Sequence, residues 1–132
     1  ATPREFFETM RELPPAKLLE SFTGKWNLYI HSGDIAFVFE IKNQEIAQPV
    51  MIGWEQSLER IFAPFTGAID PGIREYRDII VKNVDARVAT LSQGDNTIIG
   101  YSIVRGKYLI LASSEKILRE TMERFIVGPI NE

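Results

Sequence analysis

The chain has 132 residues, of which 45% are hydrophobic and 25% charged, as expected for one ordinary globular domain over residues 1–132. Its formal net charge is −3 and its basic residues are scattered among acidic ones, which argues against a nucleic-acid-binding protein with a clustered basic face. It contains no cysteine, so disulfides, thiol nucleophiles and thiolate metal sites are excluded. No apolar run reaches the roughly 18–20 residues that a membrane-spanning helix needs.

The first 24 residues predict two short helices. A capping box at residues 2–5 starts the first helix, and Pro14-Pro15 ends it because proline cannot donate a backbone hydrogen bond. The second helix is expected over residues 16–22, before a stop at Gly24. Two interpretations of residues 1–24 stay open: they pack on the sheet, or they connect the domain to an upstream region.

The next stretch predicts an antiparallel hairpin. Trp26, Leu28 and Ile30 alternate with polar or amphipathic residues, which is the pattern of a half-buried strand. Residues 35–39 are all apolar, as in a strand that is covered on both faces. Ser32-Gly33 between the two runs indicates a two-residue turn. We therefore expect the second strand of this hairpin to lie centrally in a sheet.

A long amphipathic helix is expected after the hairpin, and its first residue depends on a proline. If Asn43 caps the helix, Pro49 lies inside it and removes an internal hydrogen bond. We prefer a regular helix that begins at Gln48, because Pro49 then occupies the favourable first position. Glu55 and Glu59 lie off the apolar stripe of this helix, so we expect both on a solvated face.

Residues 63–76 form the least regular part of the sequence, with two prolines and two glycines. Long connections of this kind are often functional. Asp70, Arg74 and Tyr76 in this connection are therefore candidate binding residues. His31, beside the first hairpin turn, is the fourth candidate.

Four short strands are expected next, over residues 78–82, 86–91, 97–104 and 107–112. Residues 83–85 form a tight turn or bulge, and Arg105-Gly106 is a second two-residue hairpin signal. Ser113 or Ser114 caps a final amphipathic helix. The predicted fold is α+β, with an antiparallel sheet of about five to six strands, helices packed mainly on one face, and the element order α-β-β-α-β-β-β-β-α.

No residue pattern in the sequence indicates catalysis, a cofactor or a metal. His31 is the only histidine, and a zinc site needs three or four protein ligands. Glu40 interrupts an apolar strand and is expected to be exposed or to pair with Lys82 or Arg87. Phosphate-binding glycine loops and nucleophile elbows are missing. The sequence therefore predicts a protein that is not an enzyme and has no cofactor.

Four segments of the sequence resemble segments in a group of bacterial proteins. These segments are IAFVFEIKN, GWEQSLERIF, VKNVDARV and IVRGKYLILASSEKILRETMERF. Together they cover roughly residues 35–125. The pattern resembles uncharacterised bacterial envelope proteins, and the strand-to-helix junction near the end is similar to repeats of the DUF3352-like group of membrane-anchored proteins. The resemblance implies a membrane-tethered, non-enzymatic domain, and it implies no active-site residues.

Three functions are compatible with these observations. The first is a non-catalytic, extracytoplasmic interaction domain of a larger membrane-anchored bacterial protein in the cell envelope. It would bind a protein partner and meet the membrane only through a segment outside this chain. The second is a cytosolic dimerising scaffold, because the element order resembles the roadblock/longin fold. The third is a small-ligand binder or an enzyme whose site is assembled from scattered residues.

Overall fold

The computed structural model describes residues 2–66, 75–90 and 98–127, which form one six-stranded antiparallel sheet and five α-helices. The helices are α1 (Pro3–Thr9), α2 (Ala16–Ser21), α3 (Gln44–Trp54), α4 (Leu58–Thr66) and α5 (Glu115–Val127), with a 3-10 turn at Glu55–Ser57. The strands are β1 (Phe22–His31), β2 (Asp34–Ile41), β3 (Arg77–Val81), β4 (Val84–Thr90), β5 (Ile98–Val104) and β6 (Tyr108–Ala112). Their order in the sheet is β1-β2-β6-β5-β4-β3. The predicted α+β class is confirmed.

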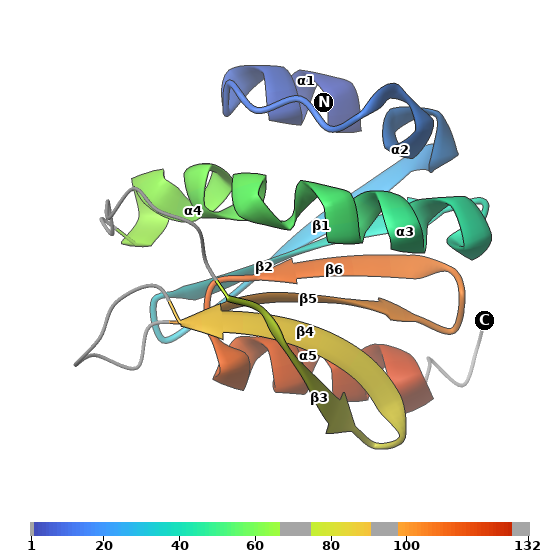
Figure 1. Ribbon diagram of the computed structural model, residues 1–132. Helices are drawn as coiled ribbons and strands as arrows, with labels where there is room; N and C mark the ends of the chain where they lie inside the picture. The colour runs from blue at the N-terminus through green and yellow to red at the C-terminus, as the bar shows by residue number, and fades with distance from the viewer. Residues whose placement is uncertain (1, 67–74, 91–97, 128–132) are drawn as a thin grey trace.

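The sheet separates two helical layers, with α1 to α4 on one face and α5 on the other (Figure 1). Alternate residues of each strand point to opposite faces, so the apolar strands supply two separate cores. The larger core lies under α1 to α4 and includes Phe37, Phe39, Met51, Phe62, Leu109 and Leu111. The smaller core lies against α5 and includes Val38, Val88, Ile110, Ile117, Leu118 and Met122. The prediction that helices lie mainly on one face is therefore confirmed.

Three hairpins of the sheet turn through two successive residues with left-handed backbone. The loops of the first two hairpins have two residues, whereas the loop between β5 and β6 has three, residues 105–107. The φ angles are 53° and 86° at Ser32-Gly33, 51° and 67° at Lys82-Asn83, and 57° and 66° at Arg105-Gly106. Turns with positive φ at both central residues match the natural twist of the flanking strands. The first turn is where the sequence predicts it. The third is at the predicted Arg105-Gly106, but its loop also includes Lys107, so β6 begins at Tyr108 and not at residue 107. The second lies at Lys82-Asn83, so β4 begins at Val84, earlier than the expected residue 86.

The start of β1 differs from the prediction. The strand begins at Phe22, which pairs with Ile41, and not at Trp26. Gly24 does not end a helix: it has a φ of 103° and lies in the irregularity between Phe22 and Trp26, where the register shifts. α2 ends earlier, at Ser21, because the buried Phe22 ring stacks on Phe7 at a centroid distance of 5.9 Å.

The start of α3 also corrects a prediction. Asn43 caps the helix by accepting a hydrogen bond from the Glu45 backbone N–H at 2.9 Å, and Pro49 lies inside the helix. The preferred start at Gln48 was therefore wrong. The proline removes one bond, to the carbonyl four residues earlier. Glu45 and Pro49 are both exposed, so water can replace the missing donor.

Phe39 of β2 lies at the centre of an aromatic cluster in the larger core. Its side chain is fully buried. Ring centroids between 5.2 and 6.5 Å from Phe39 belong to Phe6, Phe7, Phe22, Trp26 and Phe37. The cluster joins α1 to the first hairpin, so α1 packs on the sheet. A connection to an upstream region stays a prediction.

The opposite face depends on a close approach of α5 to β5. A Cβ on Gly100 would lie 2.7 Å from a Val88 methyl and 3.0 Å from a Leu118 methyl, so a larger residue would have to displace them. α5 is held at its start by Ser114, whose hydroxyl accepts a hydrogen bond from the Ile117 N–H at 3.2 Å. This contact assigns the predicted cap to Ser114.

Candidate functional site

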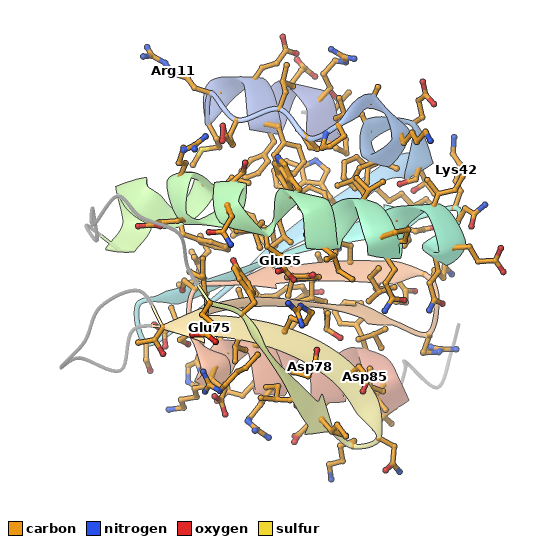
Figure 2. All side chains as sticks on the ribbon, viewed as in Figure 1. Arg11, Lys42, Glu55, Glu75, Asp78 and Asp85 are labelled. Atoms are coloured by element: carbon orange, nitrogen blue, oxygen red, sulfur yellow. The ribbon has the colours of Figure 1, made fainter. Side chains whose placement is uncertain are left out.

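A groove of about 790 Å³ lies between α3 and the strands β3, β4 and β5, and we call it the α3–β3 groove. Gln44, Gln48 and Ile52 line it from α3, because residues four apart on a helix lie on one face. The strands contribute residues 78–80, 83–87 and 101–103. Figure 2 labels Asp78 and Asp85 on the strands that lie below α3. The groove is the best-formed candidate site among the described residues.

The register of the sheet decides which strand side chains face α3. Arg87 of β4 pairs with Asp78 of β3 on one side and with Tyr101 of β5 on the other. Directly opposite residues in an antiparallel pair point to the same face. One hydrogen-bonding cluster therefore receives a side chain from each of these three strands.

The groove presents apolar side chains from both of its walls. Ile52 of α3 is 51% exposed, and Ile80 of β3 is 65% exposed. Single exposed apolar residues are ordinary on a protein surface. Here, however, the two isoleucines line the same concave surface from two different elements. This arrangement favours binding of an apolar group between them.

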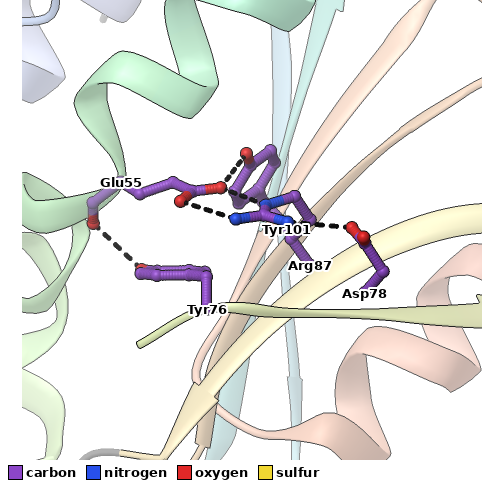
Figure 3. A network of polar contacts seen from close by, with 5 residues as sticks. All are labelled: Glu55, Tyr76, Asp78, Arg87 and Tyr101. Carbon is purple, nitrogen blue, oxygen red and sulfur yellow. Dashed lines mark hydrogen bonds and ion pairs between the residues drawn. The ribbon is translucent and has the colours of Figure 1, made fainter. Parts of the chain in front are cut away.

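Three residues that line the groove, Asp78, Arg87 and Tyr101, belong to a polar network that also contains Glu55 and Tyr76 (Figure 3). Glu55, which follows α3 directly, is only 6% exposed. The Arg87 guanidinium holds its carboxylate with two nitrogens, one of them at 3.1 Å. Tyr101 donates a third hydrogen bond to Glu55, at 2.5 Å. A buried carboxylate with these partners is fully compensated.

The network extends from Glu55 to Asp78 of β3 and to Tyr76, which precedes β3. Arg87 also donates to Asp78 at 2.9 Å, so one guanidinium bridges a buried and an exposed carboxylate. The Tyr76 hydroxyl donates to the Glu55 backbone carbonyl at 3.0 Å. The Tyr76 ring centroid lies 6.0 Å from the Arg87 guanidinium carbon. The network therefore ties the end of α3 to the strands β3, β4 and β5.

Two members of this network, Tyr101 and Arg87, keep one protonation state near neutral pH. Burial raises the pKa of Tyr101 above its ordinary value of 10.0, and the hydrogen bond to Glu55 raises the pKa further. The hydrogen bonds to Glu55 raise the pKa of Arg87, although burial acts in the opposite direction. Tyr101 is therefore a neutral donor and Arg87 a permanent cation. These roles suit a structural brace better than proton transfer, which needs a pKa near the working pH.

The four residues predicted as binding candidates do not form one site. Tyr76 belongs to the polar network. Asp70 and Arg74 lie outside the described residues. His31 lies at the end of β1 on the α5 side of the sheet, where its Nδ1 is 2.9 Å from a Glu120 oxygen. The structure therefore does not bring His31 and Tyr76 together.

The expectation for two carboxylates of the long helix was wrong. Glu55 and Glu59 were expected on a solvated face, but both are buried. The regular helix ends at Trp54, and the 3-10 turn at Glu55–Ser57 changes the direction in which the following side chains point. Arg87, one of two possible partners for Glu40, is bound to Glu55 and Asp78 instead.

Tyr101 gives a pH-dependent prediction for stability. In the folded state it keeps its proton above pH 10, whereas the unfolded chain releases it there. The contribution of Tyr101 to the free energy of unfolding is therefore fully present below pH 10. It declines by about 1.4 kcal/mol per pH unit as the pH rises further. Urea unfolding between pH 8 and pH 11.5 should show a steeper decline for the wild type than for Tyr101→Phe. Equal slopes in the wild type and in Tyr101→Phe would contradict the prediction.

Neither a metal site nor a membrane span is found in the described parts of the chain. No three His, Asp or Glu side chains among residues 2–66, 75–90 and 98–127 converge as metal ligands would. Within the same ranges, no helix has the length and apolar character needed to cross a bilayer.

Comparisons with protein-family models, with curated proteins and with solved structures find no match to this chain. The resemblance to membrane-anchored envelope proteins and the alternative of a roadblock/longin scaffold therefore both stay predictions.

Proposed function

We propose that this chain is a non-catalytic interaction domain that binds an extended segment of another protein in the α3–β3 groove. The observation that carries the proposal is the pair of exposed isoleucines, Ile52 and Ile80, on the two walls of the groove. An apolar side chain inserted between them would remove all three from water, which stabilises the complex by roughly 25 cal/mol per Å² of apolar surface.

The shape of the groove favours a protein segment over a small molecule. Its α3 wall runs from Gln44 to Ile52, about 12 Å at a rise of about 1.5 Å per residue. This length suits three or four residues of an extended chain. Small-molecule sites depend on a few polar groups that converge on the ligand. In this groove Glu55, Arg87 and Tyr101 bind one another instead.

The charges of the groove indicate the chemistry of the bound segment. The charged residues that line it are Asp78, Asp85 and Arg87. Arg87 is bound by two carboxylates, those of Glu55 and Asp78. Asp85 is exposed and lies on the same face of β4, two residues from Arg87. The surface is therefore acidic on balance, and the segment that fits it carries a lysine or arginine next to its apolar residue.

The experiment is selection from a displayed library of random 12-residue peptides, followed by fluorescence polarisation with the enriched sequences. We expect enriched peptides to combine an apolar and a basic residue. Their affinity should fall at least tenfold for Ile80→Ser and for Asp85→Lys. Ile30→Ser is the matched control, because Ile30 is an exposed isoleucine on the opposite edge strand, and this variant should bind as the wild type does.

Two results would overturn the proposal. One is a library without any enriched peptide. The other is a set of peptides that bind Ile80→Ser as tightly as the wild type, because the groove would then not be their site. Circular dichroism checks that each variant is folded, and both substitutions lie at exposed positions where folding tolerates polar residues.

A further inference from the structure

Among the described strands, none pairs with the outer edge of β1 along residues 27–31. β1 is the first strand in the sheet order, and its described residues pair with β2 on one side only. Natural edge strands are usually protected by charges, prolines or bulges, because free backbone groups bind other strands. In β1 the bulge and Lys25 are confined to the first part of the strand. The segment Asn27-Leu28-Tyr29-Ile30-His31 contains no Asp, Glu, Lys or Arg.

Residues 27–31 also expose apolar side chains. Leu28 is 47% exposed and Ile30 is 68% exposed. Both point to the face covered elsewhere by α1 to α4, since Leu28 pairs with the core residue Phe37. They lie at the rim of the larger core without being covered by it.

We infer that two copies of this chain pair through their β1 edges in an antiparallel arrangement and form one continuous sheet. The hairpin geometry selects the register. His31 and Asp34 flank a two-residue turn, so their backbone groups bond to each other within the hairpin. Backbone groups alternate in direction along a strand, so those of Leu28 and Ile30 point outward.

The register that uses these groups is self-complementary. A two-fold axis at Tyr29 places Leu28 opposite Ile30 of the second copy, and Ile30 opposite its Leu28. The N–H and C=O groups of these residues then form four backbone hydrogen bonds between the copies. The same register brings the exposed Leu28 and Ile30 side chains of both copies into contact on one face of the sheet.

The charges near this register are compatible with a second copy. In this register Lys25 lies beside the hairpin turn of the second copy, close to Asp34 of that copy, which has the opposite charge. No two like charges lie directly opposite each other. The other edge strand is less suitable. β3 has five residues and carries Arg77 and Asp78, which are charged and exposed. The second copy is therefore the occupant that fits β1.

The first experiment measures mass in solution by light scattering between 5 and 300 μM. We expect a dimer in this range for the wild type and a monomer for Ile30→Lys. Ile80→Lys is the matched control, because Ile80 is a similarly exposed isoleucine on the other edge strand, and it should remain a dimer. A monomeric wild type, or a dimer that persists in Ile30→Lys, would overturn the inference.

The second experiment tests the register by cross-linking and does not depend on a destabilising charge. The chain has no cysteine, so a single one reports its own neighbour. Tyr29→Cys would place two thiols at a non-hydrogen-bonded pair, where Cα atoms are about 4.5 Å apart, within disulfide range. Asn27→Cys would place them about 13 Å apart along the strands. We expect Tyr29→Cys to oxidise to a covalent dimer at least tenfold faster, and equal rates would exclude this register.

Discussion

Replacing Arg87 with alanine should lower the free energy of unfolding by about 3–5 kcal/mol. The variant leaves the Glu55 carboxylate, which is 6% exposed, without the cation that holds it with two nitrogens. A buried charge that loses its partner destabilises a protein by about this amount, because it stays desolvated without compensation. Tyr101 would still donate one hydrogen bond, which compensates only part of the loss. Urea unfolding at pH 7 measures the change.

The controls for this prediction separate the two carboxylates that Arg87 binds. Asp78→Asn removes the exposed partner, and the loss should be at most about 1 kcal/mol because exposed ion pairs contribute little. The double variant Arg87→Met, Glu55→Leu removes both buried charges and should recover most of the stability that Arg87→Ala loses. If Arg87→Ala lowered the free energy of unfolding by no more than Asp78→Asn does, the stabilising role assigned to the polar network would be wrong.

Phe39→Ala should also destabilise the fold by about 3–5 kcal/mol, the usual range for a fully buried ring. Phe39 contacts Phe6 and Phe7 of α1 as well as its neighbours in the first hairpin, so the cavity would open where α1 meets the sheet. We expect faster hydrogen exchange in α1 as well as a lower urea midpoint.

Phe125→Ala is the control for this substitution. Phe125 packs on the other face against Tyr29 and Tyr108 and is only partly buried, so its loss should be clearly smaller. Exchange in α1 should stay unchanged in the control. A Phe39→Ala variant within about 1 kcal/mol of the wild type would show that the aromatic cluster relaxes around the gap.

Much of the sheet could be predicted because local chemistry determines it. Ser32-Gly33 and Arg105-Gly106 adopt positive φ at the predicted turns, although the second loop has three residues and not two, and their apolar arms form β1, β2, β5 and β6. The apolar run at residues 35–39 is buried in a strand that has neighbours on both sides, as its composition predicts, although β2 lies next to the edge strand β1 and not at the centre of the sheet. The capping box at Thr2 and Glu5 forms as well.

The errors arose where tertiary contacts outweigh local preference. Pro49 favours a helix that begins one residue before it, yet the cap at Asn43 and the buried face of α3 extend the helix through the proline. Phe22 has no local signal that separates the end of a helix from the start of a strand. Phe22 is part of the strand because it is buried against Phe7 and pairs with Ile41.

The candidate site was predictable only in part, because it depends on long-range register. Tyr76 was a candidate from its place in an irregular connection. Glu55, Arg87 and Tyr101 come from three elements, and no spacing in the sequence relates them to one another. Glu55 follows Trp54 at a break between two helices, and a helical wheel drawn through that break assigns it to the wrong face. The available signal was Arg87, the one cation in β4.

The order of the strands has a consequence for how the chain folds. Consecutive strands pair everywhere in the described sheet except at the junction of β2 and β6, where residues 36–40 meet residues 108–112. The first hairpin and the β3–β6 meander can therefore form from local contacts, whereas their union requires closure of a long loop. Topologies that rely on such distant pairings fold slowly. We expect the β2–β6 seam to be the last part of the sheet to assemble and the step that limits the folding rate.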